Sequence, residues 1–178
     1  MCQLLQQLES NDITSLTLEA SPKEALEKKK PDELIDALSK NTSVTTLVLQ
    51  KDFLACLRGD VRSKLMQTIA KLPSLQSVTL GNSLLLAPDL TNLVVSVKSL
   101  CTLTLDEICL QGEPAMVQDL QVALASHGKL KSFTVTNCMA SNQEVDMKAL
   151  EDVKLGSSCA GRDAAIDPAA DVDTAHAA

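Results

Sequence analysis

Aromatic residues are almost absent from this chain of 178 residues. Trp and Tyr do not occur, and Phe53 and Phe133 are the only aromatic residues. A globular core commonly uses large aromatic side chains to fill gaps between its layers. Here Leu, Val and Ile must fill the core, and 30 residues are Leu. Such a core indicates one small packing unit that is stacked repeatedly on itself.

Positive charge is also scarce, because 16 Lys and Arg residues stand against 23 Asp and Glu residues, a net charge of −7. A general nucleic-acid binder needs a basic stripe, and an anionic membrane attracts clusters of Lys and Arg. We therefore expect neither nucleic acid nor a membrane as a partner. The one basic run, Lys28-Lys29-Lys30, is followed by Pro31-Asp32-Glu33, which favours a solvated turn ahead of a helix.

Long apolar runs are missing as well. The longest, Leu84-Leu85-Leu86-Ala87, is too short to cross a bilayer. Met1-Cys2-Gln3 has neither the basic start nor the apolar stretch of a signal peptide. The six cysteines include no Cys-x-x-Cys pair. We therefore expect reduced thiols and a cytoplasmic location.

An internal repeat is the strongest feature that the sequence does contain. Five segments share the pattern apolar-x-x-apolar-x-apolar, in which the last three apolar positions alternate. They are Ile13–Leu18, Val44–Leu49, Leu75–Leu80, Leu100–Leu105 and Leu130–Val135. Their starts are separated by 31, 31, 25 and 30 residues. The alternation and the β-forming residues predict five short strands, each with one buried face.

The segments ahead of these strands predict helices. Apolar residues stand ten and six positions before the strand in four consecutive units, and residues four apart share one face of a helix. The two sets are Leu34, Leu65, Leu90 and Leu120, and Leu38, Ile69, Val94 and Leu124. Pro31 and Pro88 suit the first turns of two of these helices. The sequence thus predicts an α/β repeat protein.

Downstream of the strands, Leu54, Leu85 and Leu110 each fall ten residues after the first apolar position. The chain here resembles the leucine-rich-repeat family, whose signature is L-x-x-L-x-L-x-x-N/C-x-L. Its repeat lengths look most like the ribonuclease-inhibitor-like branch, over about residues 3 to 155. The resemblance implies a horseshoe-shaped solenoid segment, with a parallel sheet on the concave face and helices on the convex face. It departs from the family where Asp52, Ser83 and Cys138 replace the usual Asn, and where Ser21-Pro22-Lys23 breaks the pattern.

The ends of the repeat array need caps. Leu4, Leu5 and Leu8 predict a short capping helix at the front. At the back, Met147 and Val153-Lys154-Leu155 are interpreted as a sixth repeat that fades out, which is a thin cap. We expect one domain over residues 1–155, followed by a flexible, Ala- and Asp-rich acidic tail over residues 156–178.

Little in the sequence suggests chemistry. His127 precedes Gly128 at an expected helix end, where a cation suits the helix dipole and Gly suits the C-cap. Cys109 and Cys138 stand near the Asn/Cys turn position of the family, so buried structural thiols are favoured over redox sensing. No His or Cys spacing resembles a metal site, and no phosphate-binding loop is present. We expect no enzymatic activity, no cofactor and no small-molecule substrate.

The outward-facing strand residues form the candidate binding face, since strand side chains alternate. They are mostly small hydroxyl residues without aromatics or Arg, which are the usual anchors of protein interfaces. The candidates are Ser15, Thr17, Thr46, Val48, Gln50, Ser77, Thr79, Thr102, Thr104, Asp106, Ser132, Thr134 and Thr136. The alternative interpretation is that Ser and Thr are simply soluble residues that suit strands.

The sequence as a whole favours a non-enzymatic protein–protein interaction or scaffold module. The first alternative is a structural subunit of a larger assembly, which the thin caps motivate. Binding through the helical back, the ends or a longer connection such as residues 50–62 also stays open. A further alternative, ice binding by the hydroxyl rows, needs a flat lattice, whereas the implied sheet is curved.

Overall fold

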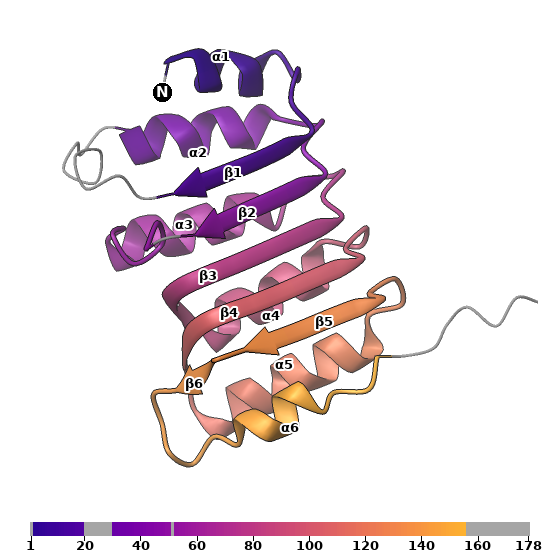
Figure 1. Cartoon of the computed structure of the whole chain (residues 1–178). Coiled ribbons are helices and arrows are strands. Elements are labelled where there is room, and N and C mark those ends of the chain that lie inside the picture. The colour runs from indigo at the N-terminus through magenta and orange to yellow at the C-terminus, as the bar shows by residue number, and fades with distance from the viewer. Residues whose placement is uncertain (1, 20–29, 51, 156–178) are drawn as a thin grey trace, which may run out of the picture.

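In the computed structural model, the chain alternates between helices and strands over residues 2–19, 30–50 and 52–155, which are the residues that the structure describes (Figure 1). The strands are β1 (Ser15–Glu19), β2 (Thr46–Gln50), β3 (Ser77–Leu86), β4 (Thr102–Gln111), β5 (Ser132–Thr136) and β6 (Met139–Ala140). The helices are α1 (Cys2–Glu9), α2 (Lys30–Lys40), α3 (Gly59–Ile69), α4 (Ala87–Ser96), α5 (Pro114–Ser126) and α6 (Met147–Glu151). The break at Ser21-Pro22-Lys23 and the predicted tail lie outside the described residues.

The strands form one parallel sheet in the order β1-β2-β3-β4-β5, and the short β6 pairs with β4. Each strand therefore lies next to the strand that follows it in the sequence, as expected of stacked repeats. The helices lie behind the sheet in Figure 1 and leave its other face uncovered. We call this uncovered side the open face. The predicted α/β architecture with a parallel sheet is confirmed.

The strands begin two residues later than the apolar pattern suggests. Val44, Leu75 and Leu100 are buried, but they lie in the turns that precede β2, β3 and β4. Cross-repeat hydrogen bonds hold these turns together. The Thr14 carbonyl accepts the backbone N–H groups of Thr45 and Thr46 at 2.8 and 3.0 Å. The same arrangement recurs in the next three repeats, so the turns are as regular as the sheet.

The core lies between the sheet and the helices and consists of aliphatic side chains. Leu47 and Leu49 point inward from β2 and are fully buried, as is Leu38 of α2. The other repeats supply the same inward Leu, Ile and Val positions, which form one continuous cluster. Burying a Leu side chain contributes about 2 kcal/mol. Stacking therefore stabilises each repeat through its neighbours.

Strands β3 and β4 are longer than predicted, because their pairing continues beyond the expected strand ends. The backbone turns at Asn82 and Glu107, with φ of 43° and 54°, and pairing then resumes from Ser83↔Ile108 to Leu86↔Gln111. The repeat that starts at Leu75 is the shortest of the set, with 25 residues before the next start. It has no room for a separate loop, so β3 leads directly into α4.

The two ends of the sheet are capped unequally. Helix α1 covers the first repeat, and its Leu8 is fully buried, as the predicted capping helix requires. At the other end Phe133 and Val135 of β5 are only half-buried. Leu150 of α6, the helix that contacts β5, is buried, but residues 153–155 form no strand. The predicted sixth repeat therefore supplies a helical turn without its strand.

Candidate functional site

The open face brings the predicted binding residues together in rows that run across the strands. Parallel pairing in register aligns equivalent positions of successive repeats. The first row is Ser15, Thr46, Ser77, Thr102 and Ser132, and the second row is Thr17, Val48, Thr79, Thr104 and Thr134. Two residues beyond the second row, Glu19 pairs with Gln50, and Asp106 pairs with both Gly81 and Thr136.

Side chains in these rows are half-buried on the central strands β2, β3 and β4, apart from the exposed Asp106, and exposed on β1 and β5. Neighbouring side chains on a sheet shield one another, so the centre of the rows is the better packed part. Val48 is the one apolar residue in the two rows. The face therefore offers hydroxyl donors and acceptors at the strand spacing, about 4.8 Å apart.

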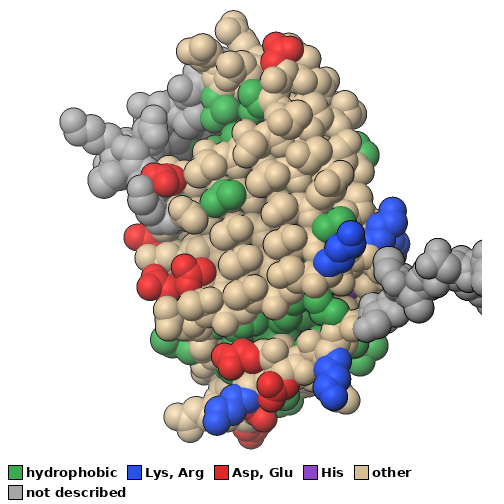
Figure 2. Space-filling view, turned by 45° about the vertical axis from the view of Figure 1, so that its right-hand side comes forward, with side chains coloured by type: hydrophobic (Ala, Val, Ile, Leu, Met, Phe, Trp, Pro, Cys, Tyr) green, Lys and Arg blue, Asp and Glu red, His purple; other side chains and the backbone are tan. Residues whose placement is uncertain are grey.

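The middle of this side of the molecule is uncharged, and charged side chains lie around it. Figure 2 shows a broad uncharged area, with acidic side chains along its left edge, basic side chains along its right edge, and both signs together at its lower end. Exposed acidic residues on this part of the chain include Asp52, shortly after the end of β2, and Asp106 and Glu107, at the bend in the middle of β4. The turns that lead from α3, α4 and α5 into the strands carry the exposed residues Lys71, Lys98 and Lys129. The open face is thus neutral in the middle and polarised along the strand direction.

Two side chains of the described residues, Lys40 and Cys138, have raised pKa values. A hydrogen bond to the Asp36 carboxylate at 2.7 Å raises the pKa of Lys40, on the helical side. Burial raises the pKa of the Cys138 thiol. Among the described residues, no group of three or more His, Cys, Asp and Glu side chains is arranged to hold a metal ion. The two rows consist of hydroxyl groups and Val48, and the hydroxyl groups can form hydrogen bonds.

His127 lies at the end of α5, as predicted, and has a structural role in the turn that follows. The side chain is 7% exposed. Its Nδ1 accepts the Leu130 N–H at 3.0 Å, and its Nε2 lies 3.0 Å from the Val97 carbonyl oxygen. The ring therefore links the turn after α5 to the preceding repeat. Gly128 does not supply a left-handed C-cap, since no described glycine has a positive φ.

Cys138 acts as the turn-stabilising residue that its position predicts. Its sulfur accepts the Ile108 N–H at 3.4 Å, and its thiol donates to the Thr136 carbonyl at 3.3 Å. The side chain is half-buried rather than buried. Cys109 is also half-buried, but it lies within β4, one residue beyond the equivalent position. Both are free thiols.

The other two replacements of the family Asn behave differently from Cys138. Ser83 is buried, and its hydroxyl has no hydrogen-bond partner within the described residues. Asp52 is exposed and has a left-handed backbone, with φ of 61°. Of these three replacements, Cys138 is therefore the one with hydrogen bonds from its side chain to the turn backbone among the described residues.

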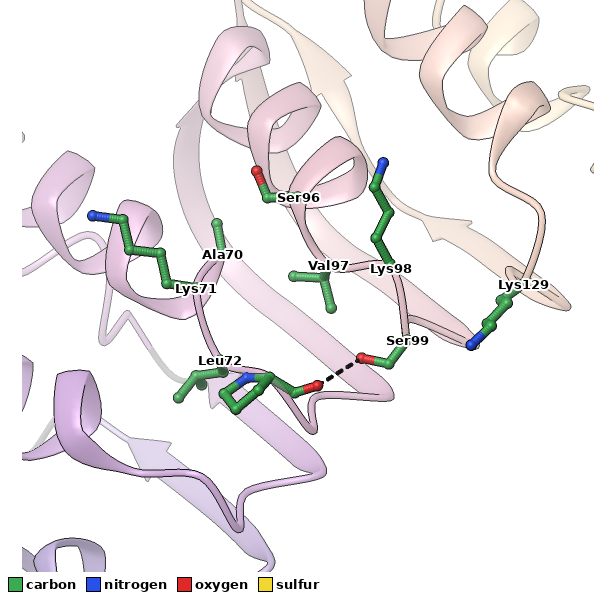
Figure 3. Close-up of a pocket in the computed structure, with 9 residues that line it drawn as sticks. Ala70, Lys71, Leu72, Ser96, Val97, Lys98, Ser99 and Lys129 are labelled. Atoms are coloured by element: carbon green, nitrogen blue, oxygen red, sulfur yellow. Dashed lines mark hydrogen bonds between the residues drawn. The ribbon is translucent and has the colours of Figure 1, made fainter.

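Sequence reasoning missed a shallow pocket at the basic edge, which Figure 3 shows. It has a volume of about 570 Å³ and lies between the turns that follow α3 and α4. Ala70, Leu72 and Val97 are its buried lining, while Lys71 and Lys98 are exposed on its rim. Lys129, from the turn after α5, completes the rim. The signal in the sequence was a Lys shortly before each of the buried turn residues Leu75, Leu100 and Leu130, by four, two and one positions.

No helix within the described ranges is long and apolar enough to span a membrane.

The known proteins that resemble this chain share its fold, at low sequence identity. Neither a protein-family model nor a curated protein matches the sequence. Among solved structures, the chain is similar to a tropomodulin C-terminal domain from Caenorhabditis elegans, with a TM-score of 0.60 and 15% identity over 83% of this chain and 85% of that chain. It is also similar to the actin-binding site 2 of leiomodin-1, with a TM-score of 0.54 and 15% identity over 75% of this chain and 77% of that chain. The parallel sheet with helices on one side fits a leucine-rich-repeat type of fold.

Proposed function

We propose that this protein is a non-enzymatic protein–protein interaction module that binds its partner on the open face. In this proposal the chain is a leucine-rich-repeat solenoid of the ribonuclease-inhibitor-like type, and the open face is its concave side. One observation carries the proposal. Two rows of mostly hydroxyl residues run in unbroken register across five strands, on the side of the sheet that the helices leave uncovered.

The chemistry of the face favours a protein partner over a reaction. Hydroxyl groups can pair with the peptide groups and polar side chains of another protein, and rigid repeat scaffolds present such surfaces for this purpose. The neutral centre between an acidic and a basic edge provides orientation, because charged edges mainly steer a partner and fix its register. A cytoplasmic location and a scaffold role belong to the same proposal.

The structural neighbours suggest which partner to test first. One of them is named for an actin-binding site, although the 15% identity supports a shared fold and nothing finer. Actin is therefore the first candidate partner for this chain.

A second candidate function is that of a structural subunit in a larger assembly. The half-buried Phe133 and Val135 at the C-terminal end of the sheet favour it, because an assembly partner seated there would complete the burial of both side chains. Dependence of the oligomeric state on concentration, measured by analytical ultracentrifugation, tests this alternative. A monodisperse monomer at all concentrations contradicts it.

The experiment that tests binding on the open face compares two double variants. Thr79→Arg/Thr104→Arg places bulk and charge in the middle of the second row. Gln67→Arg/Asn92→Arg adds the same charge at exposed positions of α3 and α4. Both variants should keep the melting temperature of the unmodified chain, because all four positions contact solvent.

Binding is measured by co-sedimentation with actin, and by affinity capture from native lysate if actin does not bind. A partner that the unmodified chain and the helical-side variant retain, and that the open-face variant loses, supports the proposal. A partner that both variants retain would move the site to the helices, the ends or the connections. If no partner is captured in either format, the interaction proposal is wrong.

A further inference from the structure

Three lysines gather at the pocket on the basic edge, and we call them the lysine edge: Lys71, Lys98 and Lys129. They come from three successive helix-to-strand turns, and stacking of the repeats brings these turns side by side (Figure 3). All three side chains are exposed. In a chain with a net charge of −7, such a local gathering of positive charge departs from the general composition.

No ion pair within the described residues neutralises the lysine edge. Elsewhere, Lys40 pairs with Asp36 at 2.7 Å and Lys64 pairs with Asp32 at 3.3 Å. Lys71 occupies the same repeat position as Lys40, four residues before the strand-turn Leu or Val. The residue four before Lys71 is Gln67, where Lys40 has Asp36. The carboxylate that would pair with Lys71 along the helix is therefore missing.

Lys129 replaces a structural residue. The equivalent turn position holds Ser43, Ser74 and Ser99 in the three preceding repeats. Each of these hydroxyls donates to a carbonyl of the repeat before it, at 2.6, 2.6 and 2.7 Å. A Lys side chain is too long to repeat this contact, and in Figure 3 Lys129 extends over the pocket toward Ser99. In the fifth repeat, Lys129 therefore places an exposed positive charge where the preceding repeats have a Ser hydroxyl that forms a hydrogen bond between repeats.

We propose that the lysine edge binds an acidic, extended segment of a protein partner, with its carboxylates paired to Lys71, Lys98 and Lys129 and its backbone crossing the pocket. This inference rests on the proposed function and names the chemistry of the partner. It also orients the partner, whose acidic segment lies at the amino ends of the strands. The acidic side chains at the opposite edge of the open face then lie against a neutral or basic part of the same partner.

The charge distribution favours a short acidic peptide over a nucleic acid or an anionic membrane. A long polyanion or a charged surface extends beyond the lysine edge and meets the net negative charge of the rest of the chain. Screening removes the interaction of exposed charges beyond about 10 Å at moderate salt. A segment that reaches only the lysine edge gains the attraction and avoids most of that repulsion.

The test uses the full chain and a fluorescein-labelled peptide of alternating Glu and Ala, with a matched peptide of alternating Gln and Ala. Fluorescence anisotropy measures the affinity at low and at moderate salt. The first variant is Lys71→Glu/Lys98→Glu/Lys129→Glu. The control variant is Lys40→Glu/Lys64→Glu/Lys148→Glu, at exposed positions away from the pocket. Each replacement lowers the charge by two, so both variants change from −7 to −13.

The proposal expects the acidic peptide to bind the unmodified chain and the Gln peptide not to bind. The affinity should fall about tenfold or more in the first variant, change much less in the control variant, and weaken as salt rises. Absence of binding at low salt, or an equal loss in both variants, overturns the proposal. Tighter binding of an oligouridylate than of the acidic peptide overturns it in favour of a nucleic acid. None of these results depends on the Thr79→Arg/Thr104→Arg experiment, so the two proposals can fail separately.

Discussion

Asn41 and His127 occupy the same position of the repeat and make the same pair of contacts, although their side chains differ in chemistry. Each lies three residues before the buried residue of its turn, Val44 or Leu130. Asn41 Oδ1 accepts the Val44 N–H at 2.9 Å, as His127 Nδ1 accepts that of Leu130 at 3.0 Å. Both side chains then reach a carbonyl of the preceding repeat.

The second contact links the repeats. Asn41 Nδ2 donates to the Leu8 carbonyl at 2.7 Å, and His127 Nε2 lies 3.0 Å from the Val97 carbonyl. Both side chains are buried. A buried N–H or carbonyl that loses its partner costs about 1–3 kcal/mol. Asn41 and His127 therefore stabilise the contact between neighbouring repeats at two separate places in the array.

Replacing His127 tests this relationship. His127→Ala leaves the Leu130 N–H and the Val97 carbonyl without partners, so we expect a loss of about 1–3 kcal/mol in the free energy of unfolding. His127→Asn copies Asn41 and should recover a good part of that loss. Urea unfolding followed by circular dichroism measures both. Equal destabilisation by Ala and Asn would contradict the equivalence of the two positions.

Glu107 offers a stabilising replacement. It has a left-handed backbone with φ of 54°, and the equivalent residues of the neighbouring repeats are Asn82 and Asn137, at 43° and 53°. Asn adopts this conformation more easily than Glu, whose strain there is on the order of 1 kcal/mol. We expect Glu107→Asn to raise the free energy of unfolding by about 0.5–1 kcal/mol. Asn82→Glu should have the opposite effect, and a gain in stability from it would contradict the argument.

Leu103 tests the stacked core. Its side chain points inward from β4 and is 1% exposed. Leu103→Ala should lower the free energy of unfolding by about 2–5 kcal/mol, because it leaves a cavity between repeats. Thr104→Ala, the next residue on the open face, is the matched control and should change stability by about 0.5 kcal/mol or less. Similar effects of the two replacements would mean that the inward and outward positions are wrongly assigned.

The Cys138 thiol predicts a pH dependence. Burial raises the pKa of this thiol in the folded state above its ordinary value of 9.0. The folded state therefore favours the protonated thiol, and this contribution to stability is complete below about pH 9 and is lost as the pH rises through the raised value. Melting temperatures above pH 9 should fall more for the unmodified chain than for Cys138→Ser, whose hydroxyl can still accept the Ile108 N–H. Parallel curves for the two proteins would show that the thiol has no such role.

Cys56 serves as an internal reference for the same thiol. It is an exposed free cysteine, whereas Cys138 is half-buried and engaged in two hydrogen bonds. Alkylation by iodoacetamide near neutral pH, mapped by mass spectrometry, should modify Cys56 well before Cys138, since the thiolate is the reactive form. Faster modification of Cys138 would favour the redox-sensing alternative.

The sequence by itself determined the repeat, the inward-facing side chains and the order of the elements. Each of these follows from a short-range period: two for the strands, about four for the helices, and 25 to 31 residues for the unit. Leu47, Leu49 and Leu103 could be assigned to the core in this way because a period fixes which face of an element a residue occupies. The capping helix at Leu8 followed from the same pattern.

Only the tertiary structure decided which side chains of different repeats meet. The contact of the His127 ring with the Val97 carbonyl joins two repeats, and the long strands β3 and β4 depend on their mutual pairing. The lysine edge likewise exists because three turns are stacked, although Lys71 and Lys129 lie far apart in the sequence. Periodicity shows on which face of a helix or strand a residue lies. Contacts between repeats depend instead on the length of each connection and on the register in which the repeats stack.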